Sequence, residues 1–292
     1  MEIFDKSWLS KLWRPSDKDN KYGAGQVTIV GGSSLFHGAP LLALKAASRL
    51  VSMVYFATPE ADREVAEKLK VSLASFIWVP FGQVNEYVKK SDAVLIGPGM
   101  MRNKEEGVGM VIDSAGKESR ETTLTITTEN PNQKYVIDGG ALQVISANEI
   151  PVGSVITPNR KEYLMLFGEE LIEGREIEQL EARAKKYKIT IVHKASEAIV
   201  TDGEKTVVII GGNPGLVTGG VGDVIAGLTV GFFAKNESVL AAAAAMYLTK
   251  RAAERLDERT GMMVNADDLA EEVVQVYGEV VLSQDIVSTP RS

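Results

Sequence analysis

The stretch from Asn213 to Ala234, NPGLVTGGVGDVIAGLTVGFFA, runs from a glycine-rich loop directly into a long apolar segment. Glycines let the backbone approach a ligand closely, and the free amides at the start of a helix attract anionic oxygens. The apolar run over 221–234 is typical of a buried helix. The stretch therefore predicts a phosphate-binding turn that opens a helix, with one carboxylate, Asp223, inside the turn.

Asp223 has two possible roles in such a turn. An acid in the first turn of a helix can act as a cap. In a phosphate site it can instead act as a general base, taking a proton from a hydroxyl while the amides hold the phosphoryl group that the hydroxyl attacks. A cap does not need Gly219, Gly220 and Gly222 around it, and this favours the base.

Two common phosphate loops do not fit this sequence. No GK[ST] follows the glycines, so the loop is not a Walker loop. It also lies late in the chain after a hairpin, whereas a dinucleotide fingerprint follows an early strand.

Short β-branched runs alternate with helical patterns along the rest of the chain, which predicts an α/β sandwich with a mostly parallel sheet. The predicted strands are near-continuously apolar, as in a sheet covered on both faces. They are residues 26–30, 53–57, 76–80, 92–97, 134–138, 153–157, 189–194, 197–202 and 206–210. Helices are expected at 40–51, 63–70, 140–147, 159–168, 221–234 and 237–259. The last two strands, joined by a turn at Asp202 and Gly203, predict an antiparallel hairpin at the sheet edge.

The composition predicts one soluble globular domain over residues 1–292. The chain is 45% hydrophobic and 24% charged, with no abrupt shift along its length. Phe4, Trp8 and Leu12 recur at helical spacing, so residues 1–20 are expected to form a helical extension on the body or on a neighbouring subunit. The polar end, 283–292, is expected to be a flexible tail.

Charge and residue usage exclude several classes of function. A net charge of −7 with scattered basic residues argues against nucleic acid binding. The chain has no cysteine, so disulfides and thiolate nucleophiles are excluded. No segment reaches the ~20 apolar residues of a membrane span. The first residues lack the apolar core of a signal peptide. We therefore expect a cytoplasmic protein with no membrane partner.

Several loops are expected to meet the glycine loop at one rim of the sheet. In open α/β sheets, ligands collect at the carboxyl ends of the strands. The loops that follow predicted strands there read GGSSLFHGAP, GPGMM, DGGAL and TPNRKE. All are rich in small and polar residues, so this rim is the predicted ligand site.

The glycine loop resembles the signature of the NAD(P)H-hydrate dehydratases, a branch of the ribokinase-like superfamily. That signature reads NPG, two residues, TGG, one residue and GDV. GQVTIVGGS, DAVLIGPGM, VIDGGAL and VITPNRKE match in the family's order, so the resemblance spans about Gly25 to Asp268. It implies a ribokinase-like three-layer α/β/α sandwich. It also implies a lyase that restores hydrated NADH or NADPH by phosphorylating the hydrate hydroxyl and eliminating phosphate.

The resemblance also implies which residues act. Asp223 would activate the hydroxyl, and Gly220 and Gly222 would stabilise the transferred phosphoryl group. The hydrate would be bound by Ala39, Gly99, Asp138, Asn159 and Asp223, and the nucleotide by Lys194, Ala195, Ser196, Thr218, Gly219 and Gly222.

Co-substrate, metal and assembly follow from the same resemblance and from the reaction. The co-substrate would be ADP or ATP. ADP is favoured because the resemblance is closest to dehydratases without a fused epimerase domain. Mg²⁺ is expected from phosphoryl transfer, with ligands that the sequence does not identify. The family tends to form tetramers, so a homotetramer is expected.

Two positions depart from the family pattern. Asn159 stands where the family usually has a histidine that contacts the hydrate, and Gly140 replaces the second acid of DADAL. Asparagine cannot carry a proton at neutral pH. Two alternatives stay open. A kinase for a hydroxymethylpyrimidine, thiazole alcohol or sugar would use Asp223 as base in the same way, and the two departures would suit a catalytically weak nucleotide-binding protein.

Simpler structural roles compete with function at the remaining candidates. His37 could contact ligand or only shape its loop, while His193 is expected to be structural. Asp138 could cap a helix near Ala141. Glu162 could be a surface acid, and Trp8 and Trp13 are expected to serve packing or subunit contact.

Overall fold

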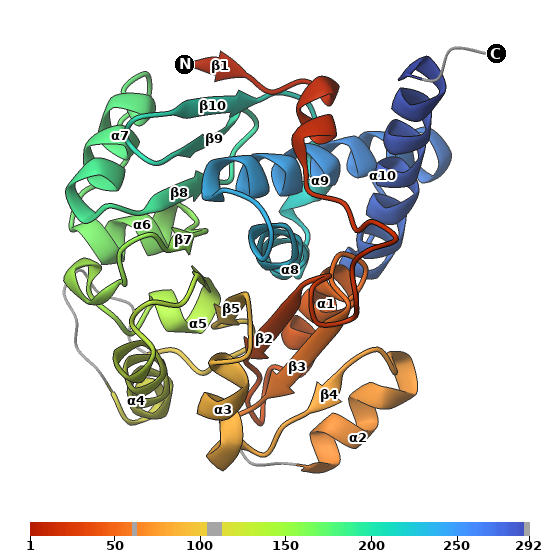
Figure 1. Cartoon of the computed structure of the whole chain (residues 1–292). Coiled ribbons are helices and arrows are strands. Elements are labelled where there is room, and N and C mark those ends of the chain that lie inside the picture. Colours follow the sequence, from red (N-terminus) through yellow and green to blue (C-terminus); the bar gives the residue numbers. More distant parts are fainter. Residues whose placement is uncertain (60–62, 104–112, 289–292) are drawn as a thin grey trace.

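The fold is built on one central sheet, whose strands come from residues 2 to 209 of the chain (Figure 1). The computed structural model describes residues 1–59, 63–103 and 113–288. Ten strands of this described part are arranged in the order β1-β10-β9-β8-β7-β6-β5-β2-β3-β4. They are β1 (Glu2–Ile3), β2 (Gln26–Val30), β3 (Met53–Ala57), β4 (Ile77–Trp78), β5 (Ala93–Ile96), β6 (Tyr135–Ile137), β7 (Val155–Ile156), β8 (Thr190–His193), β9 (Ala198–Thr201) and β10 (Thr206–Ile209).

The sheet is mostly parallel, as predicted. Neighbouring strands run parallel except where β9 pairs with β8 and with β10. The β9–β10 hairpin turns at 202–205, where the carboxylate of Asp202 accepts hydrogen bonds from the amides of Glu204 and Lys205. The predicted antiparallel hairpin is therefore confirmed, although β1, which the sequence did not reveal, lies outside it and forms the true edge.

Helices cover both faces of the sheet and bury two hydrophobic cores. One face carries α1 (Gly38–Ala47), α2 (Arg63–Ser72), α8 (Val221–Phe233), α9 (Ser238–Thr260) and α10 (Ala266–Ser288). The other carries α3 (Val84–Val88), α4 (Ser114–Glu129), α5 (Gly139–Leu142), α6 (Arg160–Phe167) and α7 (Glu176–Tyr187). Short 3-10 helices are η1 (Lys6–Lys11), η2 (Phe81–Gln83), η3 (Ala147–Glu149) and η4 (Pro214–Val217).

The strands supply side chains to both cores in alternation. In β3, Val54 and Phe56 belong to the core under α1, whereas Tyr55 and Ala57 belong to the core on the opposite face. Consecutive strand residues point to opposite faces, so a strand buried on both sides must be apolar throughout. This explains the continuous apolar runs in the sequence and confirms the layered α/β architecture.

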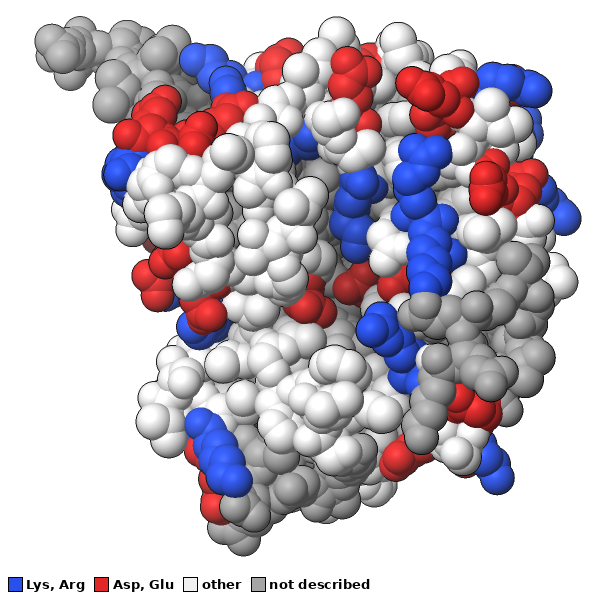
Figure 2. All heavy atoms as spheres, turned by 180° about the vertical axis from the view of Figure 1, so that it is seen from behind, with Lys and Arg blue, Asp and Glu red and all other residues white. Residues whose placement is uncertain are grey.

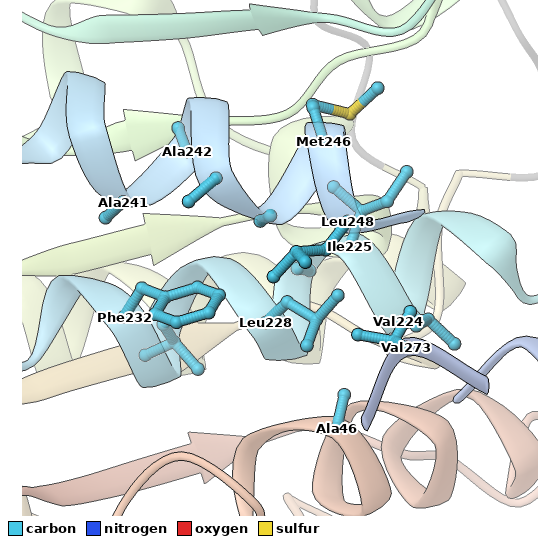
Figure 3. Packing of buried hydrophobic residues seen from close by; sticks show 14 of the residues in the cluster. Ala46, Val224, Ile225, Leu228, Phe232, Ala241, Ala242, Met246, Leu248 and Val273 are labelled. Carbon is cyan, nitrogen blue, oxygen red and sulfur yellow. The ribbon is translucent and has the colours of Figure 1, made fainter. Parts of the chain in front are cut away.

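Helix α8 lies between α9 and α1 (Figure 3). Its apolar side chains contact both neighbours, with Leu228 and Phe232 among them. A Cβ atom added at Gly227 would lie 2.4 Å from the carbonyl oxygen of Ala43 in α1. The glycine therefore allows the backbones of α1 and α8 to approach closely.

The N-terminal segment packs on the body, but as a strand and a 3-10 helix instead of the predicted amphipathic helix. β1 pairs with β10, and η1 follows it. The centroid of the Phe4 ring lies 5.2 Å from the centroid of the Trp8 ring and 5.0 Å from that of the Tyr247 ring in α9. The Trp13 amide donates a hydrogen bond to Asn236 Oδ1 at 2.8 Å. Packing therefore accounts for Trp8, whereas the Trp13 ring lies near Lys235, whose Nζ is 5.8 Å from the ring centroid.

The C-terminal helix α10 was not among the predicted helices. α10 continues to Ser288 and so overlaps the predicted tail 283–292, of which residues 289–292 lie outside the described residues. The flexibility of that tail stays a prediction. Within the described ranges, no helix has both the length and the apolar character needed to cross a membrane.

Candidate functional site

A cavity of about 790 Å³ lies beside the carboxyl ends of β6, β7, β8 and β10. It is lined by Arg102, Asp138, Gly139, Asn159, Glu162, Lys194, Ala195, Ser196, Gly211, Gly212, Asn213, Pro214, Leu216, Val217, Thr218, Gly219, Gly220, Val221, Gly222, Asp223, Ile225, Met246 and Lys250. The face of the molecule in Figure 2 is hollowed near its middle, with basic and acidic side chains around the hollow. The cavity lining has the same mixture of charges, and it joins the DGGAL and TPNRKE loops to the glycine loop.

Asp223 is the third residue of α8 and does not cap it. The capping position belongs to Gly220. The pKa of the Asp223 carboxyl is raised to about 7, mainly by burial and then by the charge of Asp138, with a smaller contribution from Glu162 and an opposing one from Lys194. A carboxyl that titrates near neutral pH can accept a proton during turnover, which is the property of a general base.

The glycines of the loop have different reasons to be glycine. Gly220 has a φ of +94°, and an added Cβ would lie 2.5 Å from Leu42 Cδ1. At Gly222 an added Cβ would lie 3.3 Å from Lys194 Nζ, so the missing side chain leaves room for this ammonium group. Gly219 has nothing within 4 Å of the Cβ position. Amides in the first turn of a helix have no acceptor inside the helix, so the Gly222 amide is available to a ligand in the cavity that this residue lines.

Lys194 and Asp138 form an ion pair in the cavity lining. Lys194 Nζ lies 3.4 Å from Asp138 Oδ1, which also accepts a hydrogen bond from the Thr157 hydroxyl. Asp138 is only 4% exposed, and its side chain makes no capping hydrogen bond to α5. The alternative that Asp138 is merely a helix cap is therefore wrong.

Asn159 and Glu162 hold each other at the start of α6. Asn159 Oδ1 accepts a hydrogen bond from the backbone amide of Glu162, and Glu162 Oε2 accepts one from the backbone amide of Asn159, both at 2.9 Å. Gln143 Nε2 donates to Glu162 Oε1 at 3.1 Å, a contact that the sequence did not suggest. Glu162 is 5% exposed, so the surface alternative is wrong. Burial first, and then the charge of Asp138, raises the pKa of its carboxyl.

The departure at Gly140 has a steric reason. A Cβ atom added there would lie 2.3 Å from the carbonyl oxygen of Met100, so this backbone leaves no room for the acid of the family pattern. Gly140 is buried and does not line the cavity.

Ala39 and Gly99 adjoin each other but do not line the cavity. An added Cβ at Gly99 would lie 3.3 Å from Ala39 Cβ and 2.4 Å from the carbonyl oxygen of Phe36. Their predicted contact with substrate therefore stays a prediction.

Neither histidine lines the cavity. His37 occupies the capping position of α1 and makes no side-chain capping bond. His193 is buried in β8, where burial lowers the pKa of its imidazole and keeps it neutral at pH 7. This agrees with the structural role expected for His193.

Two basic residues of the lining were missed by sequence reasoning. Arg102 follows the GPGM turn, and Lys250 is a single lysine in the alanine-rich helix α9. Lys250 is 1% exposed. A lysine on the apolar stripe of a helix was the available signal, since charged residues are almost never fully buried without a partner.

The cavity lining contains the carboxylates of Asp138, Glu162 and Asp223. Within residues 1–59, 63–103 and 113–288, no group of three or more His, Asp or Glu side chains is placed to hold a metal ion. Mg²⁺ commonly uses one or two carboxylates together with substrate phosphates. Asp138 and Glu162 could supply such carboxylates.

The overall architecture is that of ribokinase-like proteins. An Enterococcus faecalis protein described as a member of the ribokinase-like superfamily superposes with a TM-score of 0.81 at 22% identity, covering 96% of each chain. The ADP/ATP-dependent NAD(P)H-hydrate dehydratase of Bacillus subtilis, crystallised with ATP and Mg²⁺, gives a TM-score of 0.78 at 20% identity, covering 96% of this chain and 98% of that one. At these identities the likeness shows the fold alone.

Sequence comparison defines the family within that fold. The pattern of the NAD(P)H-hydrate dehydratases matches residues 27–275. The ADP-dependent (S)-NAD(P)H-hydrate dehydratase of Cenarchaeum symbiosum is 31% identical over 263 residues, which cover 87% of this chain and 89% of that protein. The chain therefore belongs to the NAD(P)H-hydrate dehydratase family, and the predicted family resemblance is confirmed.

Proposed function

We propose that this protein removes water from hydrated NADH or NADPH in a reaction driven by ADP or ATP. The observation that carries the proposal is a carboxyl with a pKa of about 7, Asp223, beside the glycine loop and facing the charges of Asp138, Glu162 and Lys194. The ADP dependence of the Cenarchaeum symbiosum relative supports ADP as the nucleotide.

In the proposed mechanism, Asp223 accepts the proton of the hydrate hydroxyl while the hydroxyl oxygen attacks the terminal phosphorus of the nucleotide. The Gly222 amide and the Lys194 ammonium hold the phosphoryl oxygens, supported by the backbone at Gly220. ADP would thereby become AMP. The C–O bond of the phosphate ester then breaks and phosphate leaves with the bonding electrons, because phosphate is a far better leaving group than hydroxide. The lone pair of the ring nitrogen drives this step, and loss of a proton from the neighbouring carbon restores the dihydronicotinamide.

Mg²⁺ would screen charge between the attacking oxygen and the phosphates, held by Asp138 or Glu162 together with the nucleotide. Lys194 and Thr157 hold Asp138 in place for this. The Glu162 carboxylate is held by hydrogen bonds from Gln143 Nε2 and from the backbone amide of Asn159.

Other residues are proposed to bind rather than react. The nucleotide would contact Ala195, Ser196, Thr218 and Gly219 in addition to Lys194 and Gly222, all of which line one cavity. The hydrate would contact the side-chain nitrogen Nδ2 of Asn159, because Asn159 Oδ1 already accepts a hydrogen bond from the backbone amide of Glu162. Ala39 and Gly99 would lie at the far end of the hydrate.

An absorbance assay tests the proposal. Purified protein mixed with hydrated NADH or NADPH and with ADP or ATP should restore the absorbance band of reduced nicotinamide, and a reaction without nucleotide is the control. Absence of recovery with either nucleotide would contradict the proposal. A stable phosphorylated alcohol as product would instead establish the small-molecule kinase, and nucleotide binding without turnover would establish the weak binding protein.

We also propose that residues 1–292 act as one domain and that the protein works as a cytoplasmic homotetramer. Participation of both β1 and β10 in one sheet supports the single domain. The proposed substrates are damaged forms of the cell's own nicotinamide cofactors, which supports the location. Analytical ultracentrifugation checks the stoichiometry, and a monomer at micromolar concentration would contradict it.

A further inference from the structure

The ammonium group of Lys250 is buried against backbone instead of against a carboxylate. Its Nζ atom donates to three carbonyl oxygens: Ala195 at 3.1 Å, Ser196 at 2.5 Å and Gly211 at 2.8 Å. A lysine ammonium has three protons, so each proton has one acceptor. Burial lowers the pKa of this group, which means that the fold holds the cation at an energetic cost. Apolar packing alone gives no reason to retain a lysine here.

The three carbonyls come from two separate walls of the cavity. Ala195 and Ser196 follow β8, whereas Gly211 follows β10. Lys250 itself belongs to α9 and also lines the cavity. The side chain therefore connects the loop after β8 to the loop after β10, and both loops are held against α9.

Holding these carbonyls also sets the direction of the amides bonded to them. In a trans peptide the N–H points opposite to the C=O. With the Ala195 and Ser196 oxygens turned to Lys250, the amides of Ser196 and Glu197 point away from it. In the part of the chain that the structure describes, neither amide donates to another protein group. Of the two residues, Ser196 lines the cavity, so its amide is a suitable contact for an anionic ligand there.

A second set of contacts from α9 holds the other loop. The Gly212 amide donates to Glu254 Oε1 at 2.7 Å, and Asn213 Nδ2 donates to the carbonyl oxygen of Ala253 at 2.7 Å. Gly211 and Gly212 both have positive φ, at +104° and +82°. This backbone leads into the glycine loop, so α9 fixes the segment from which that loop starts.

We propose that Lys250 is a positioning residue for the nucleotide. It orients the amide of Ser196, which lines the cavity, toward the nucleotide's phosphates and keeps the two loops at the spacing that the nucleotide requires. It does so without direct contact, because all three of its protons are used. The inference rests on the proposed binding of ADP or ATP in this cavity, and it adds a residue that neither the glycine loop nor the family pattern indicated.

Steady-state kinetics of Lys250→Met test this role. Methionine keeps most of the apolar volume but cannot donate. We expect the KM for the nucleotide to rise at least about tenfold, since several hydrogen bonds from a charged donor are lost. The kcat at saturating nucleotide should fall less than about threefold, because Asp223 and Lys194 are untouched. Nucleotide affinity measured by calorimetry should fall in parallel with the KM.

Lys134→Met is the matched control. Lys134 Nζ also donates to backbone carbonyls, those of Phe233 at 3.1 Å and Asn236 at 3.3 Å, but it does not line the cavity. It should lose stability and leave the nucleotide KM unchanged.

Glu254→Ala is a milder variant for the case in which Lys250→Met does not fold. It removes the acceptor of the Gly212 amide and should raise the nucleotide KM about threefold or more.

An unchanged nucleotide KM in folded Lys250→Met, or in Glu254→Ala if the first variant does not fold, would overturn the positioning role. A rise in the Lys134→Met KM equal to that in Lys250→Met would also overturn it, because the effect would then be a general loss of stability. If the unmodified protein binds neither ADP nor ATP, the proposed function fails instead.

Discussion

Asp223 is a carboxyl group whose ionisation is opposed by its surroundings. Because its pKa is raised to about 7, its basic form is lost as the pH falls below neutrality. We expect kcat/KM to fall about tenfold per pH unit below pH 7. A pH–rate profile at fixed nucleotide concentration measures this, with circular dichroism as a check that the protein stays folded. A flat profile down to pH 5 would assign the proton transfer to another group.

Removing that carboxylate should separate activity from stability. Asp223→Asn should abolish turnover and leave nucleotide affinity unchanged or tighter, because a negative charge near the phosphates is gone. A carboxyl whose pKa rises on folding destabilises the native state progressively above its unfolded pKa of 3.8, and the penalty is complete above about pH 7. The asparagine variant should therefore be more stable, and the gain should be larger at pH 8 than at pH 5 by about 2 kcal/mol.

Urea unfolding at the two pH values measures this difference in the free energy of unfolding. Retention of most of the activity by Asp223→Asn would contradict the general-base role. Equal stability of the two proteins at pH 8 would contradict the raised pKa.

At the scale of elements, the glycines of α8 explain how the phosphate loop is held. Gly227→Ala would place a Cβ atom 2.4 Å from the Ala43 carbonyl oxygen, so α1 and α8 would have to separate. We expect a loss of about 1–3 kcal/mol in the free energy of unfolding, as in other overpacked contacts.

Gly278→Ala in α10 is the matched control for that change. A Cβ at Gly278 would have nothing within 4 Å, so the better helix propensity of alanine should stabilise the protein by up to about 1 kcal/mol. Equal effects of the two substitutions in thermal unfolding would show that close packing does not decide the position of α8.

The sequence predicted elements where their periodicity was strong and missed them where tertiary contacts decide. The β-branched runs were sufficient for β2 and β3. β1 has two residues, too few for any pattern, and forms because β10 offers an open edge. α4 contains a threonine-rich run that is not typical of a helix. Its Thr123 and Thr127 hydroxyls donate to carbonyls one turn back, which lets them be buried.

At the scale of the whole molecule, the residues of the candidate site also divide into those that a local pattern predicts and those that only tertiary contacts reveal. Asp223 and the glycines were predictable because one short stretch carries both the loop and the start of its helix. Lys250 and Gln143 were not, because their roles exist only once distant loops meet. Asn159 shows an intermediate case: its position was predicted, but its capping pair with Glu162 appeared only in the structure.

Nucleotide binding should stabilise the whole fold, because the cavity draws its lining from the loops after β6, β7, β8 and β10 and from α9. A ligand that binds only the native state at about 100 times its Kd adds about 2.7 kcal/mol to the free energy of unfolding. For a chain of this size we expect a rise in Tm of about 5 °C. Differential scanning fluorimetry with ADP, ATP and inorganic phosphate measures this, with phosphate as the control. The nucleotide that gives the larger shift at equal concentration is the one that the cavity prefers, and no shift with millimolar ADP or ATP would contradict binding in this cavity.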